Sequence, residues 1–295
     1  EFHIPVLLGK YANATSYFNA VDFQNLLFDN NPDGSMKEYY AEISYGNFLV
    51  DGVAGGWYQS TYTMEQAEQN TSGYVAEVVQ LADPEFDFSQ YDNDGPDNVP
   101  NSGDDDGFVD GIIVVYSGCG AEVNEGNNNI WPHQSSLYND QYQTNDPSAN
   151  GGYVIVNTYA VCPELSGGGD CWTNQIRPIG VYAHEFGHIL GLPDLYDRDD
   201  SSAGIGSWCL MASGSHNGQM GTTPAHMSVW CKMQLNWLNP AVLASDETDF
   251  SFPPITNNGF ALQIWEDDYN WSSYFLIENR KSVGFDSELP GQGLM

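Results

Sequence analysis

The segment IGVYAHEFGHILGLPD, residues 179–194, restricts the fold more than any other part of the chain. Its apolar residues and the lack of an internal proline predict a helix from about Ile179 to Leu190. Gly191 is expected to end this helix in the left-handed conformation, and Pro193 prevents the helix from resuming. The chain must therefore turn back sharply beside the helix.

The predicted helix carries the spacing of a metal site. Residues four apart lie on one face of a helix, so His184 and His188 can direct their imidazole nitrogens at one ion. Glu185 follows the first histidine, and we expect it to act as a general base that takes a proton from water beside the metal. A catalytic zinc ion also needs a third protein ligand and one open position.

The sequence after the glycine offers that third ligand. Asp194 stands six residues after His188, and the turn can bring it back to the ion. Asp197 and a more distant glutamate are the competing third ligands, and we favour Asp194. Residues 207–215, SWCLMASGS, place Met211 among small residues, as in a tight turn beneath a metal site. The alternative for Met211 is ordinary packing in an apolar core.

The order of the predicted elements favours an α+β architecture. Residues 107–118 and 151–161 contain β-branched runs that predict buried central strands. Residues 35–58 are expected to pass from a helix into a hairpin, and an amphipathic helix is expected within residues 62–82. Beyond residue 239 short alternating segments predict a β-rich part, which we expect to be truncated.

The charge balance excludes some partners. Seven Lys and Arg stand against 40 Asp and Glu, a formal net charge of −33. Nucleic acid and anionic membranes need a basic surface, so neither is expected as a partner. No apolar stretch reaches the roughly 18 residues of a membrane span. The N-terminus resembles an internal start, so any export signal is expected upstream.

Residues 83–110 contain ten acidic residues and no Lys or Arg. A hard cation held by carboxylate and backbone oxygens would relieve their mutual repulsion, so we favour a calcium loop there. The alternative is a solvated acidic loop, because the spacing does not match an EF-hand. The candidate ligands are Asp92, Asp94, Asp104, Asp106 and Asp110.

Five cysteines lack the paired spacing of a structural zinc site. Cys162 and Cys171 flank a tight loop and are expected to form a local disulfide, and Cys209 with Cys231 is a second candidate pair. Disulfides favour an oxidising compartment. Cys119 would remain as a buried thiol.

The sequence resembles a known family. HEFGHILGLPDLYD followed by LMASGS resembles the metzincin pattern, and more closely the immune inhibitor A family of secreted bacterial metallopeptidases. The similarity extends over nearly the whole chain. The segments similar to that family, in order, are KEYYAEISYGNF, DGFVDGIIVVYSG, IWPHQ, TPAHMSVWCKMQLNW and YFLIENRKSVGFDSELPGQGL.

This resemblance implies a zinc endopeptidase that is exported, made with an upstream propeptide, and active on polypeptides. It implies a mixed twisted sheet and the active-site helix in an upper subdomain, residues 1–191, which also contains the acidic segment. A lower subdomain, residues 192–238, and a β-rich continuation, residues 239–295, would follow. The resemblance carries the zinc-ligand role to His184, His188 and Asp194, the base to Glu185 and the Met-turn to Met211.

Two other functions remain as alternatives. The first is a catalytically inactive, calcium-stabilised surface-binding or adhesion module on the same fold. The intact Glu185 argues against it, because a decayed peptidase is expected to lose its base or a metal ligand. The second is a zinc hydrolase that acts on a small amide. The resemblance favours polypeptide substrates.

Overall fold

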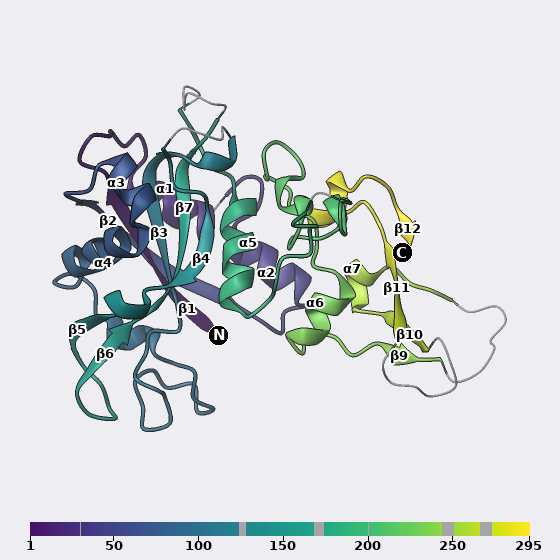
Figure 1. Ribbon diagram of the computed structural model, residues 1–295. Coiled ribbons are helices and arrows are strands. Elements are labelled where there is room, and N and C mark those ends of the chain that lie inside the picture. The colour runs from purple at the N-terminus through teal and green to yellow at the C-terminus, as the bar shows by residue number, and fades with distance from the viewer. Residues whose placement is uncertain (30, 124–127, 168–173, 200, 244–250, 266–272) are drawn as a thin grey trace.

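The computed structural model describes residues 1–295, apart from residues 30, 124–127, 168–173, 200, 244–250 and 266–272. Figure 1 shows a larger part, built on the sheet that holds the N-terminal strand, and a smaller part that holds the C-terminal strands. Helix α5 (Ile179–Ile189) lies between them. This mixture of helices and sheets agrees with the α+β class predicted from the sequence. The subdomain boundaries at residues 191 and 238 remain a prediction.

The larger part is built on a mixed sheet with the strand order β2–β1–β3–β7–β4, and β8 pairs with the end of β7. These strands are β1 (Phe2–Lys10), β2 (Val50–Gln59), β3 (Ile112–Cys119), β4 (His133–Ser136), β7 (Thr158–Ser166) and β8 (Gln175–Ile176). β2, β1, β3 and β7 are parallel neighbours, whereas β4 runs antiparallel to β7 at the edge of the sheet.

The other helices are α1 (Ala20–Leu27), α2 (Met36–Ile43), α3 (Met64–Gln69), α4 (Thr71–Ala82), α6 (Val229–Gln234) and α7 (Ile255–Asn258). The other strands are β5 (Tyr142–Pro147), β6 (Tyr153–Val156), β9 (Ala241–Val242), β10 (Ala261–Trp265), β11 (Tyr274–Arg280) and β12 (Gly293–Leu294). None of the helices among the described residues combines the length and the apolar character that crossing a membrane requires.

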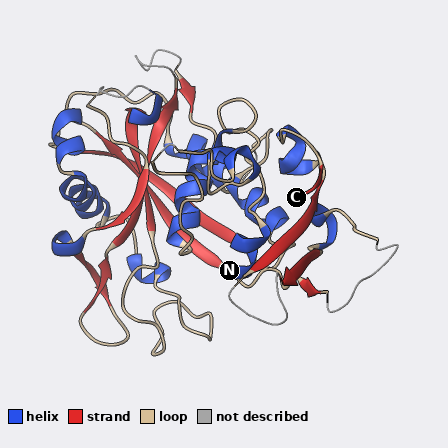
Figure 2. Cartoon of the chain, turned by 45° about the vertical axis from the view of Figure 1, so that its right-hand side comes forward, coloured by secondary structure: helices blue, strands red, loops and turns tan. Residues whose placement is uncertain are grey.

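Helices cover both faces of the sheet, as Figure 2 shows. Successive side chains of a strand point to opposite faces. Ile113 and Val115 of β3 therefore join a core with α1, α2 and α5, whereas Ile112 and Val114 join a second core with α4. Burial on both faces explains why β3 is a continuous apolar run.

The structure corrects the hairpin expected within residues 35–58. The helix expected there is α2, but the following residues form the single strand β2, which pairs in parallel with β1. The run at residues 151–161 is likewise divided between β6 and β7. In both segments strand character was predicted, but the pairing depends on residues far away in the sequence.

The expected disulfide between Cys162 and Cys171 is wrong. Cys162 is a free, buried thiol near the centre of β7, where it packs into the core shared with α5. Cys119, expected to be a free thiol, is instead disulfide-bonded. Cys209 and Cys231 are free, with their sulfur atoms 4.0 Å apart. Cys171 lies outside the described residues.

The smaller part contains a four-stranded sheet with the order β12–β11–β10–β9. It is the β-rich structure that the alternating sequence pattern predicts. A buried ion pair within this part, Arg280 of β11 with Asp286, is hydrogen-bonded to the rest of the molecule. Arg280 donates to the carbonyl oxygen of Trp208, and Asp286 accepts from the backbone amide of His226. Phe285 packs edge-on against Tyr39 of α2, with the ring centroids 5.1 Å apart.

Candidate metal centre

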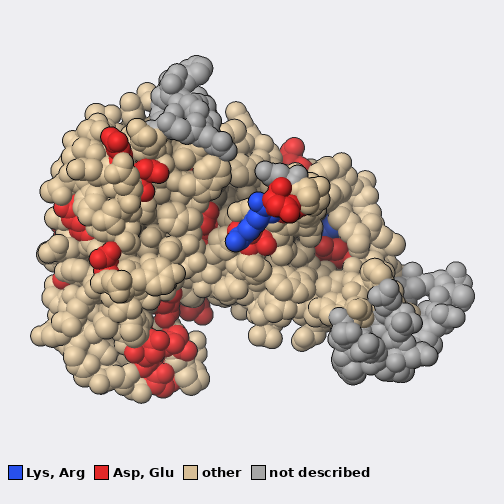
Figure 3. Space-filling view, viewed as in Figure 1, with Lys and Arg blue, Asp and Glu red and all other residues tan. Residues whose placement is uncertain are grey.

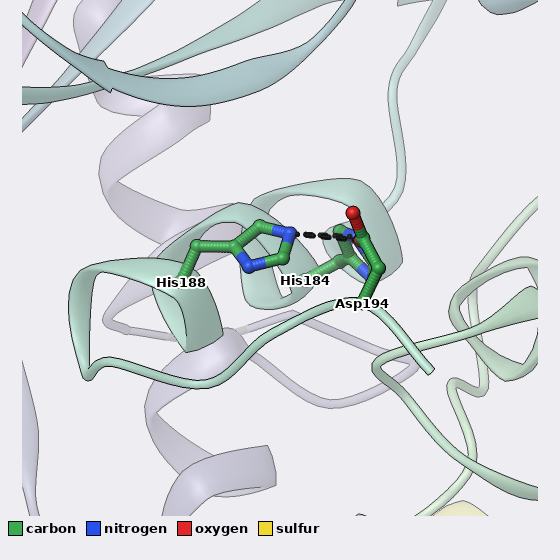
Figure 4. Close-up of side chains that lie close together, drawn as sticks. All are labelled: His184, His188 and Asp194. Carbon is green, nitrogen blue, oxygen red and sulfur yellow. Dashed lines mark hydrogen bonds and ion pairs between the residues drawn. The ribbon is translucent and has the colours of Figure 1, made fainter. Parts of the chain in front are cut away.

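Helix α5 and the turn after it bring three side chains together (Figure 4). The helix ends as the sequence predicts, because Gly191 adopts a left-handed φ of 92°. Nε2 of His184 lies 3.2 Å from Nε2 of His188. Oδ1 of Asp194 lies 3.2 Å from the first nitrogen and 3.1 Å from the second. The three atoms form a nearly equilateral triangle.

The size of this triangle fits a zinc ion. Ligand atoms about 2.0–2.2 Å from a tetrahedral zinc ion lie roughly 3.3–3.5 Å from one another. The distances of 3.1–3.2 Å in the triangle are close to that range. Two histidine nitrogens and one carboxylate oxygen are also the donor types of catalytic zinc sites, which leave a fourth position open.

Backbone carbonyl groups orient both imidazoles. Nδ1 of His184 donates to the carbonyl oxygen of Leu210 at 2.8 Å, and Nδ1 of His188 donates to that of Leu192 at 2.7 Å. A proton on each Nδ1 leaves the lone pair of each Nε2 directed at the centre of the triangle. The histidines are thus held in the tautomer that binds a metal.

Glu185 lies beside the triangle without being one of its corners. It is 5% exposed, and burial raises the pKa of its carboxyl group to about 7, against the opposing effect of His184 and His188. Its Oε2 has no hydrogen-bond partner among the described residues. A carboxylate with one uncommitted oxygen is suited to exchanging a proton with a water molecule or a substrate.

Met211 packs against helix α5. It is fully buried, and a Cβ added at Gly187 would lie 2.5 Å from its sulfur atom. The backbone amide of Leu195 donates to the carbonyl oxygen of Met211 at 2.7 Å. The turn around Met211 is therefore in contact with both the helix that bears the histidines and the loop that bears Asp194.

Asp194, and not Asp197, is next to the histidines. Asp197 instead accepts hydrogen bonds from the hydroxyl groups of Ser201 and Ser202. The second carboxylate oxygen of Asp194, Oδ2, accepts a hydrogen bond from Nη2 of Arg198 at 2.6 Å. Although burial opposes it, bonding to the two histidines and Arg198 holds the pKa of Asp194 well below its usual range.

A pocket of about 420 Å³ opens over the triangle. It is lined by Trp131 and His133 from the edge-strand region, by residues of α5, and by Ala212 and Ser213, which follow Met211. Tyr196 and Arg198 complete the side formed by the loop after Asp194. The candidate metal position is therefore open to a substrate on one side.

A network of polar side chains lies beside this pocket, and its residues are not among the predicted site residues. Arg177 is fully buried, 3.6 Å from a carboxylate oxygen of Glu122, and its Nη2 donates to Nε2 of His216. Nδ1 of His216 bonds to the hydroxyl group of Ser215, which donates to the carbonyl oxygen of Ala212. Burial, followed by Arg177, lowers the pKa of His216 to about 4, so this imidazole is neutral near pH 7.

The structure brings together only some of the expected calcium ligands. Asp92, Asp94 and Asp106 each offer an oxygen within 4.8 Å of the others. Asp110 is adjacent, since it lines the same pocket as Asp94 and Asp106. Asp104 is not in this group and instead bonds to the hydroxyl group of Ser102.

Asp105 has a role that the sequence did not indicate. Its two carboxylate oxygens accept hydrogen bonds from the backbone amides of Gly95, at 2.7 Å, and Ser102, at 2.6 Å. It therefore closes the acidic loop on itself. An acidic residue among ten gives no sequence signal that separates loop closure from metal binding.

Comparison with known proteins places the chain among the metallopeptidases. The sequence model of one protein family, described as the catalytic domain of the immune inhibitor A peptidase M6, matches residues 10–239. The chain therefore belongs to the immune inhibitor A peptidase family, as its sequence resemblance predicted.

Curated relatives agree with this family. The chain is 30% identical, over 266 residues, to the pre-pro-metalloprotease PrtV of Vibrio cholerae serotype O1; the match covers 77% of this chain and 28% of that protein. It is 29% identical, over 250 residues, to immune inhibitor A of Bacillus thuringiensis subsp. alesti, covering 72% of this chain and 34% of that protein. The chain thus spans about a third of the length of these relatives.

Proposed function

We propose that this chain is the catalytic part of a zinc-dependent endopeptidase. His184, His188 and Asp194 would hold the zinc ion, and Glu185 would act as the general base. The observation that carries the proposal is the triangle of three ligand atoms 3.1–3.2 Å apart at the base of an open pocket. Membership in a metallopeptidase family supports the same function.

The residues around the triangle divide the chemistry between them. A zinc ion bound there supplies Lewis-acid chemistry, because it lowers the pKa of water and polarises a peptide carbonyl group. Glu185 accepts a proton from the attacking water and passes it to the amine that leaves. The carbonyl groups of Leu210 and Leu192 keep the two imidazoles in one orientation during this exchange.

The edge strand β4 supports the choice of an extended polypeptide as the substrate. One side of β4 pairs with β7, and no other described strand pairs with its opposite side. His133 and Gln134 of β4 line the pocket above the triangle. An extended peptide can add to such an edge through main-chain hydrogen bonds, which would set its scissile bond across the pocket. A small amide would use none of this edge.

We further propose that the protein is secreted and made with an upstream propeptide. The name of the Vibrio cholerae relative describes a pre-pro-metalloprotease. The strongly acidic composition and the disulfide at Cys119 are compatible with an extracellular, oxidising environment.

Metal removal tests the proposed enzyme. A chelator selective for transition metals should abolish cleavage of denatured casein, because no side chain of the triangle can replace a Lewis acid. Adding zinc after removing the chelator should restore cleavage, whereas adding calcium should not. Cleavage that persists in a sample shown to contain no transition metal would contradict the metallopeptidase proposal.

Calcium is our second proposed metal, bound by Asp92, Asp94 and Asp106, with Asp110 adjacent. Three carboxylates within 4.8 Å of one another repel unless a cation or protons lie between them. Asp92 is only 1% exposed, and its Oδ1 has no hydrogen-bond partner among the described residues. Hard oxygen ligands of this kind suit calcium.

We expect saturating calcium to raise the melting temperature of the zinc-loaded protein, since a ligand at about 100 times its Kd adds about 2.7 kcal/mol of stability. Asp106→Asn should weaken this response because it removes a charged ligand. Asp104→Asn is the matched control, since Asp104 lies outside the cluster. Calorimetric scans of the three proteins, with and without calcium, measure the effect. If calcium raises the melting temperature of all three proteins equally, Asp106 is not a calcium ligand and the proposed site is wrong.

A further inference from the structure

Arg198 is the only Lys or Arg among the described residues that line the pocket above the triangle. Accessible cations are rare in this protein. Three of its seven Lys and Arg side chains, those of Arg177, Lys232 and Arg280, are at most 1% exposed. The face in Figure 3 shows many acidic side chains and very few basic ones. A basic side chain at the candidate active site is therefore an exception to the overall charge pattern.

Most of the hydrogen-bonding capacity of Arg198 is unused. Its side chain is 75% exposed, and Nη2 donates to Oδ2 of Asp194 at 2.6 Å. This is its only hydrogen bond to another described side chain. A guanidinium group has five N–H donors in a planar fork, so the others remain available to a ligand in the pocket.

The contact with Asp194 fixes where those donors are. Oδ1 of Asp194 faces the two histidines, while Oδ2 faces Arg198. The two oxygens belong to one carboxylate, so the guanidinium group lies directly behind a proposed zinc ligand. A ligand that reaches Arg198 would therefore lie close to the reacting carbonyl group of a bound peptide.

The charges around the pocket indicate which kind of ligand would bind to Arg198. A formal net charge of −33 disfavours the approach of an anionic substrate, and Glu122 lines the same pocket. An acidic group would need a local cation to bind there, and Arg198 is suited to it. Arginine and carboxylate groups form paired, charge-assisted hydrogen bonds, which a neutral amide cannot match.

We propose that Arg198 binds a carboxylate of the substrate and so gives the enzyme a preference for peptides with an acidic group near the scissile bond. The carboxylate can come from an Asp or Glu side chain or from the C-terminus of a short peptide. This inference rests on the proposed peptidase function. It makes Arg198 a specificity-determining residue in addition to its contact with Asp194.

Four peptides of one parent sequence test the proposal. They carry either Glu or Gln at one position near the scissile bond, each with a free or an amidated C-terminus. The value of kcat/KM and the Kd are measured for each peptide on the zinc-loaded wild type, on Arg198→Gln and on Lys281→Gln. Lys281 is exposed and does not line the pocket, so its variant has the same change of charge elsewhere.

For wild type and Lys281→Gln we expect a preference of about tenfold for one carboxylate over its amide, equivalent to about 1.4 kcal/mol. Arg198→Gln should reduce that ratio to about one. The Glu–Gln pair reports a side-chain carboxylate, and the free–amidated pair reports the C-terminus. A variant that merely disturbs Asp194 and zinc would lower the values for all four peptides together and leave the ratios unchanged.

The outcomes separate this inference from the proposed function. Ratios near one for the wild type, or ratios that Arg198→Gln does not change, would overturn the role of Arg198 even if every peptide is cleaved. If no peptide is cleaved, the endopeptidase proposal fails, and the Kd ratios still decide whether Arg198 binds a carboxylate. Zinc content measured on each sample confirms that the proteins compared carry the same metal.

Discussion

Replacing Glu185 with glutamine is expected to lower the rate of cleavage of denatured casein by about 10²- to 10⁴-fold while zinc remains bound. Glutamine keeps the size of the side chain but cannot accept the proton from water. The carboxylate of Glu185 is not a corner of the triangle formed by His184, His188 and Asp194, so the variant retains all three proposed zinc ligands. Initial rates and zinc content, measured on the same samples, check both parts of the prediction.

The exposed acid Glu68 of α3 offers a matched control. Glu68→Gln makes the same chemical change at a residue that does not line the pocket and should leave the rate unchanged. A wild-type rate in Glu185→Gln would exclude this residue as the base, and loss of zinc from the variant would instead make it a ligand. If wild type and variant both bind zinc and neither cleaves, the surface-binding alternative gains support.

The local features of the candidate site could be predicted because their determinants lie within one segment. The helix over residues 179–189, the left-handed Gly191 and the return of Asp194 depend on helix geometry and on a glycine–proline stop signal. The choice of Asp194 over Asp197 also followed from the turn. Their roles in catalysis remain proposals.

Features that join distant segments could not be predicted in the same way. The pairing of β2 with β1 depends on two strands about 50 residues apart, and local turn signals suggested a hairpin instead. The Cys162–Cys171 pairing used closeness in sequence, but Cys162 is held inside a central strand. The hydrogen bond between Arg177 and His216 joins two side chains that are 39 residues apart in the sequence. Neither residue type is unusual by itself.

The individual calcium ligands could not be predicted, because the acidic segment offers many equivalent carboxylates. With ten acids in residues 83–110, composition predicts an acidic loop but not which carboxylates face one another. Asp104 and Asp106 are two residues apart, yet only Asp106 lies beside Asp92 and Asp94. Between them, the side-chain carboxylate of Asp105 accepts hydrogen bonds from the backbone amides of Gly95 and Ser102 and so fixes the path of the loop.

Asp286→Ala is expected to lower the free energy of unfolding by about 3–5 kcal/mol, because it removes one partner of a buried ion pair. This loss is larger than that of a typical surface substitution. Asp286 is fully buried and accepts hydrogen bonds from Nε of Arg280, at 2.7 Å, and from the backbone amide of His226, at 2.9 Å. Without it, the buried guanidinium group of Arg280 keeps Glu278 as its remaining carboxylate contact, at 3.4 Å. Denaturant unfolding with zinc and calcium held constant would measure the loss.

The loss of stability in Asp286→Ala is expected to extend beyond the C-terminal strands. The backbone amide of the neighbouring Phe285 donates a hydrogen bond to Glu42 of α2, and α2 packs on α5. Glu288→Ala is the matched control, because Glu288 is exposed in the same turn and should change stability by about 0.5 kcal/mol or less. If Asp286→Ala is no more destabilising than Glu288→Ala, the ion pair with Arg280 does not hold the C-terminal strands against the catalytic part. A large loss specific to Asp286→Ala would show that residues beyond the family match at 10–239 stabilise the part of the chain that contains the candidate metal centre.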